Sequence, residues 1–168
     1  MSANRFLIVL VVLAALFSLP LAAIAGTTVR SSGPLSDLQT TLDNPTDDAR
    51  ARAQVTEHAA GSTVTLVVMG LDTAAAGMTL GAHVHVGECV TGNGAAALGH
   101  YYTGAGPISP QTEVWLDFKI RGDGVGRATA QVPFVIPEGG ASAIVIHEHP
   151  TDPGGIAGGR LACIGIDL

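Results

Sequence analysis

The sequence has few basic residues, only two cysteines and no sign of a long helix. Among its 168 residues, eight lysines and arginines stand against fourteen acidic residues, which gives a net charge of −6. No basic stripe is visible along the chain, so a nucleic acid is not expected as a partner. No internal repeat is evident either. The length is sufficient for one domain with a hydrophobic core.

Cys89 and Cys163 are the two cysteines. Two cysteines in an exported chain are typical of one disulfide bond, and two free buried thiols are the alternative. The disulfide would close a loop of about 75 residues, which is worth about 4–5 kcal/mol in the chain-entropy model. No cysteine follows the N-terminal apolar run, so a lipid-modified N-terminus is not expected.

Residues 1–25 predict a secretory signal peptide. Arg5 precedes an apolar run over residues 6–19, and the small residues 23–25 form a cleavage site before Gly26. That order is typical of a signal peptide. An uncleaved membrane anchor is the alternative, because the apolar segment is close to the length that crosses a bilayer. In both cases we expect an extracytoplasmic protein: secreted, periplasmic or associated with the cell envelope.

The remaining chain divides into a polar segment and a β-rich segment. Residues 26–52 are rich in Thr, Ser, Asp, Pro and Ala, which predicts a flexible stem with a possible first strand at residues 27–30. We expect the compact domain over residues 53–168. There the polarity alternates with a period of two, and glycines fall between the alternating segments. The expected strands cover residues 53–56, 62–68, 80–86, 113–120, 126–132, 143–147 and 161–166. A hairpin turn is expected at residues 121–124. This pattern indicates an all-β sandwich or barrel.

Histidines within this domain predict a metal site. His83 and His85 are two residues apart in an extended segment, so both imidazoles lie on one face and Val84 points to the other. His100 and His147 follow further along the chain. Neutral imidazole nitrogens suit copper, zinc, iron and nickel. Histidines without a nearby cage of carboxylates point away from magnesium and calcium.

Four segments together resemble the copper/zinc superoxide dismutases. They read GAHVHVGEC at residues 81–89, GH at 99–100, VIHE at 145–148 and GRLACIGI at 159–166. Their order and approximate spacing agree with the family over about residues 53–168. The last segment is highly specific, whereas the H-V-H triplet alone would be weak. The resemblance implies an eight-stranded antiparallel Greek-key barrel or sandwich.

The resemblance also implies roles for single residues. It implies four copper ligands, which are His83, His85, His100 and His147. In the family, the histidine that matches His100 bridges copper and zinc. Cys89 and Cys163 match the family's disulfide, and Arg160 matches the arginine beside copper that guides the superoxide anion.

The chain departs from the family at the zinc site. The family supplies two further histidines and an aspartate after the bridging histidine. Here Asp117 matches the aspartate, but no other histidine lies between His100 and Asp117. One histidine and one aspartate cannot fill a tetrahedral zinc site, so zinc is not expected. The chain therefore resembles the zinc-lacking, copper-only branch. We take Asp117 as the candidate acceptor for the outer nitrogen of His100.

These features imply an exported superoxide dismutase that converts superoxide to dioxygen and hydrogen peroxide, with Arg160 and His100 as its catalytic residues. The first alternative is a non-catalytic, extracytoplasmic copper-binding module on the same fold. Arg160 favours catalysis, since storage needs no cation beside copper, while the short segment between His147 and Arg160 slightly favours the module. A structural β domain with a degenerate site is the second alternative. A retained N-terminal segment would add a membrane tether.

Overall fold

The computed structural model describes residues 26–39 and 44–168. The predicted signal peptide or anchor at residues 1–25 lies outside these ranges. Over the part of the chain that is described, no helix is both long and apolar enough to cross a membrane.

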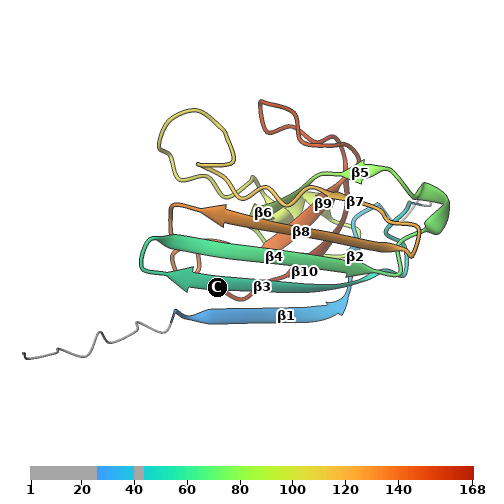
Figure 1. The fold of residues 1–168 in the computed structure, drawn as a ribbon, viewed down its shortest axis with the longest axis horizontal. Coiled ribbons are helices and arrows are strands. Elements are labelled where there is room, and N and C mark those ends of the chain that lie inside the picture. The colour runs from blue at the N-terminus through green and yellow to red at the C-terminus, as the bar shows by residue number, and fades with distance from the viewer. Residues whose placement is uncertain (1–25, 40–43) are drawn as a thin grey trace, which may run out of the picture.

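Two four-stranded antiparallel sheets pack against each other (Figure 1). The first sheet has the order β1 (Thr28–Pro34), β3 (Arg50–His58), β4 (Gly61–Met69), β8 (Val125–Val132). The second has the order β2 (Ser36–Asp37), β10 (Arg160–Gly165), β9 (Ala143–His147), β6 (Ala82–His85). A short third sheet joins β5 (Thr79–Leu80) to β7 (Phe118–Lys119), and two 3₁₀ turns are η1 (Thr73–Ala75) and η2 (Gly94–Ala97). The predicted all-β Greek-key sandwich is confirmed.

The core lies between the two main sheets and follows from the alternation of the strands. On β4, Val64, Leu66 and Val68 are fully buried, and on β9 Ile144 and Ile146 are equally buried. All five belong to one hydrophobic cluster. Burying a side chain of this size contributes roughly 1.5–3 kcal/mol. The outward-facing surfaces of the two sheets are not part of this core, so a functional site can lie on either of them.

The possible first strand expected at residues 27–30 is present as β1, but the remaining described part of residues 26–52 belongs to the domain and is not a flexible stem. β1 pairs with β3 along its whole length, from Thr28 opposite Thr56 to Pro34 opposite Arg50. Ala49 is buried against the core. The inward positions of β1 include a serine and a glycine. The strand therefore lacks the strong apolar alternation from which its full length could have been predicted. The domain therefore begins at β1, ahead of residue 53.

Two other expected strands are shorter in the structure. The segment 80–86 is divided at Gly81 into β5 and β6, and β7 is the only strand within residues 113–120. The upstream part of that segment forms only isolated bridges, in which Glu113 lies opposite Tyr102 and Trp115 opposite His83. The expected turn at residues 121–124 is present, because the amide of Gly124 donates to the carbonyl of Arg121 at 2.9 Å.

Candidate metal centre

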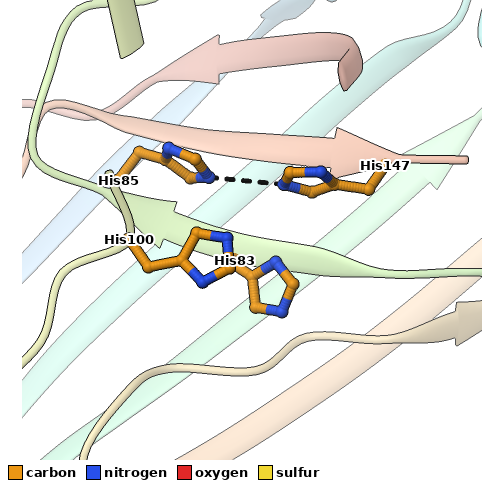
Figure 2. A group of neighbouring side chains, drawn as sticks. All are labelled: His83, His85, His100 and His147. Carbon is orange, nitrogen blue, oxygen red and sulfur yellow. Dashed lines mark hydrogen bonds between the residues drawn. The ribbon is translucent and has the colours of Figure 1, made fainter. Parts of the chain in front are cut away.

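Four histidines from three separate segments meet at one point (Figure 2). His83 and His85 lie on β6, His147 ends β9, and His100 lies in a loop. One ring nitrogen from each falls within 4.8 Å of the others. The first three are buried, whereas the side chain of His100 keeps 18% of its surface exposed. The remaining histidines, His58 and His149, are exposed and outside this group.

Strand geometry puts the cluster on the outer face of the second sheet. Val84 points into the core, so its neighbours His83 and His85 point the other way. Their partners on β9 are Val145 and Ala143, and His147 shares this face with them. The site therefore lies on a rigid sheet but outside the main core.

Two of the ligands are oriented by backbone carbonyls. The Nδ1 atom of His85 lies 3.3 Å from the carbonyl oxygens of both Ala97 and Leu98. The Nδ1 atom of His147 lies 3.4 Å from the carbonyl oxygen of Gly158. A carbonyl can only accept, so each Nδ1 carries the proton and each Nε2 carries a lone pair. The two Nε2 atoms face each other at 3.3 Å, as two ligands of one ion would.

His83 is held in the opposite orientation. Its Nε2 atom lies 2.9 Å from the hydroxyl of Thr151, which donates to the carboxylate of Asp117 at 2.5 Å. Its Nδ1 atom is buried and has no hydrogen-bond partner. An unpaired buried nitrogen costs about 1–3 kcal/mol. A metal ion bound to Nδ1 would remove that cost, so the donor set fits a metal.

The outer nitrogen of His100 contacts Glu113, not Asp117 as we had expected. Its Nδ1 atom lies 3.0 Å from an oxygen of Glu113, and the same oxygen accepts from the indole of Trp115 at 2.8 Å. Asp117 instead supports His83 through Thr151. Sequence reasoning missed Glu113 and Thr151. Glu113 and Asp117 share parity in an extended segment, which is a signal that could have placed both on one face.

Burial keeps three of the four imidazoles neutral. Loss of solvation, together with the neighbouring histidines, lowers the pKa of His83 to about 2 and that of His85 to about 3. The pKa of His147 falls to about 4, again mainly through loss of solvation. Neutral imidazoles offer their lone pairs at neutral pH, which is the form that binds a metal.

A β-bulge brings Arg160 to the ligands. The pairing of β10 with β9 shifts between Arg160 and Ala162, so Leu161 is the extra residue. The side chain of Leu161 is buried in the core, and Arg160 lies opposite His147 on the outer face. The guanidinium donates to the carbonyls of Gly94 and Leu98. Its charge contributes to the lowered pKa of His85 and His147.

The disulfide lies next to the loop that carries Ala97 and Leu98. Cys89 and Cys163 are bonded, which confirms the predicted pair. Cys163 belongs to a small buried cluster on the outer face of the second sheet, with Ala97 among its members. Because the carbonyl of Ala97 contacts His85, the disulfide and this cluster hold the loop that orients a ligand.

Comparison with known proteins shows the fold. No family model and no curated protein matches the sequence. Among solved structures, a double mutant of a SOD-like protein from Bacillus subtilis matches with a TM-score of 0.59 and 20% identity, covering 86% of this chain and 99% of that chain. This protein therefore has the all-β fold of a SOD-like protein, and it carries on that fold a four-histidine group able to bind a metal ion.

Proposed function

We propose that this protein is an exported superoxide dismutase with one copper ion at the four-histidine site and no zinc. The observation that carries the proposal is the pairing of the nitrogens. In each histidine, the ring nitrogen that faces away from the cluster has a hydrogen-bond partner. The nitrogens that face the cluster are Nδ1 of His83 and Nε2 of the other three. Four such donors suit Cu(II) and tolerate Cu(I). A copper ion bound there would supply one-electron chemistry, taking an electron from one superoxide and giving it, with two protons, to a second.

Arg160 supports catalysis rather than storage. Its charge is permanent, and it lies beside His147 at the edge of the site. A protein of net charge −6 repels anions at long range. A fixed local cation would offset that repulsion and guide superoxide toward the ligands.

His100 is the ligand best placed to handle a proton. It is the only one of the four that is partly open to solvent. Glu113 accepts from Nδ1 and so holds a proton at that atom while Nε2 faces the site. The same contact supports a zinc-free site, because Glu113 occupies the nitrogen that a second metal would need.

The disulfide supports export. Disulfide bonds persist in oxidising compartments and are rare in the cytosol. Together with the apolar N-terminal segment, the bond between Cys89 and Cys163 favours an extracytoplasmic location.

The test measures metal content and superoxide turnover on one sample of copper-loaded protein. We expect one copper per chain, negligible zinc and fast turnover. One tightly bound copper without turnover would contradict the enzymatic function and indicate a copper-binding module. A folded chain that binds no copper would indicate a structural domain.

A further inference from the structure

The outer face of the first sheet carries no acidic residue. Even-numbered residues of β1 and β3 and odd-numbered residues of β4 and β8 point outward, and none of them is Asp or Glu. Half of the eight lysines and arginines of the chain lie there. They are Arg30, Arg50, Arg52 and Arg127. The chain has fourteen acidic residues in all, yet none of them occupies an outward position on these strands, so this face is positive on an acidic protein.

The sheet register gathers these arginines from distant parts of the sequence. Arg52 and Arg127 lie in one row across the sheet, with Val67 between them. Arg30 donates to Gln54 of the next strand at 3.1 Å. Arg30 and Arg52 border a shallow depression of about 420 Å³. All four guanidinium groups are on exposed residues, and neither ion pair in the described ranges includes one of them.

The shape of this face selects among anionic ligands. It is a broad sheet surface, not a helix or ribbon that enters a nucleic-acid groove. Its outward positions include no Phe, Tyr or Trp, so it lacks a stacking platform for single-stranded nucleic acid. Arg50 has Asp47 and Asp48 near it, whereas Arg30, Arg52 and Arg127 lie among outward positions that carry no carboxylate. Arginines in such surroundings suit phosphate groups presented on a surface.

The place of the N-terminal segment points to a membrane. A retained N-terminal segment, with its apolar run over residues 6–19, would bring a membrane close to Thr28, the first residue of β1, which is the edge strand of this same sheet. We propose that the outer face of the first sheet docks on an anionic lipid surface. Each arginine close to such a surface adds to the attraction, which salt weakens.

Docking in this way would leave the metal site accessible. The four histidines lie on the outer face of the second sheet. The two sheets form opposite layers of the sandwich (Figure 1), so this face lies away from the outer face of the first sheet. The proposal does not depend on copper or on turnover, because none of the four arginines contacts a ligand histidine.

The test is flotation of the full chain with two kinds of vesicle, pure phosphatidylcholine and an equal mixture with phosphatidylglycerol. A retained apolar segment would bind both kinds, so the readout is the gain in affinity caused by the anionic lipid. The test variant is Arg52→Gln with Arg127→Gln. Its matched control is Lys119→Gln with Arg121→Gln, which removes the same charge from exposed positions outside this face. Circular dichroism and copper content verify that both variants are intact.

We expect the anionic gain to fall about thirtyfold in the test variant and to change little in the control. It should also vanish near 1 M salt. Equal losses in both variants would mean that net charge alone acts, and the docking face would be wrong. No preference for anionic vesicles would overturn the proposal, as would binding to heparin without binding to vesicles, which would assign the face to a soluble polyanion.

Discussion

The Nδ1 atom of His100 lies 3.0 Å from the carboxylate of Glu113, whose side chain is only 4% exposed. Because that carboxylate also accepts from Trp115, it has two donors and no solvent to replace either. Glu113 thereby fixes which nitrogen of His100 faces the other ligands. Groups that orient a ligand in this way contribute to metal affinity although they do not touch the metal.

Replacing Glu113→Gln should weaken copper binding by about 10–100-fold and lower turnover. The amide keeps the shape of the side chain but removes the negative charge and presents donors beside two existing donors. A competition assay with a copper chelator measures the affinity. Glu138→Gln, at an exposed position, is the matched control. Unchanged copper affinity in the Glu113→Gln variant would show that His100 needs no such partner.

Thr151→Val should also weaken copper binding, through His83. The hydroxyl is the sole link between Nε2 of His83 and Asp117, and valine keeps its volume. Nε2 of His83 loses its partner, while Asp117 loses one donor and keeps the backbone amides of Thr151 and Ala82. We therefore expect a loss of about 1–3 kcal/mol in the free energy of unfolding. Urea titration and copper competition measure the two effects. Thr129→Val on β8 removes only an exposed hydrogen bond to Thr65 at 3.2 Å, so it should leave copper affinity unchanged and alter the free energy of unfolding less than Thr151→Val does. A Thr151→Val variant with wild-type affinity would contradict the linkage.

The sequence predicted the four histidines and the Greek-key sandwich better than the surroundings of the site. The shared face of His83 and His85 can be predicted because the two residues are two positions apart in one short segment. Strands such as β4 can be predicted because apolar and polar residues alternate strongly along them. Only the start of β1 was predicted, at residues 27–30, because the rest of the strand is stabilised by pairing with β3 at the sheet edge and not by its own side chains. Thr151 reaches His83 from 68 residues away, and that distance in sequence carries no local signal.

Arg160→Glu should cut turnover strongly while copper stays bound. The substitution reverses the charge that would attract superoxide, whereas the four ligands are untouched. Stopped-flow measurement across a range of ionic strength tests this, because steering weakens as salt screens it. Arg121→Glu, an equal charge change at an exposed turn, should have a small effect. Full turnover in the Arg160→Glu variant would remove the steering role.

The metal-free protein should lose stability as the pH falls below 6.5. The pKa of His83, His85 and His147 is lowered from 6.5 to about 2, 3 and 4 respectively. Below 6.5 the unfolded chain therefore takes up protons that the folded chain excludes, and the loss continues until each folded pKa is reached. Each histidine contributes up to about 1.4 kcal/mol per pH unit.

Urea unfolding of the metal-free protein between pH 8 and pH 4 measures this dependence. His147→Gln should reduce the slope because it removes one of the three groups. A free energy of unfolding that stays constant over this range would mean that the imidazoles are not held neutral.

Replacing both cysteines by serine should destabilise the fold and loosen the metal site together. The two residues are 74 positions apart, so the disulfide removes about 4–5 kcal/mol of chain entropy from the unfolded state. The bond also fixes the loop whose carbonyls at Ala97 and Leu98 orient His85 and, through Leu98, Arg160. We therefore expect copper affinity to fall even under conditions where the double variant remains folded. Urea titration with and without copper separates the two effects, and a variant that loses stability but keeps full copper affinity would limit the disulfide to a structural role.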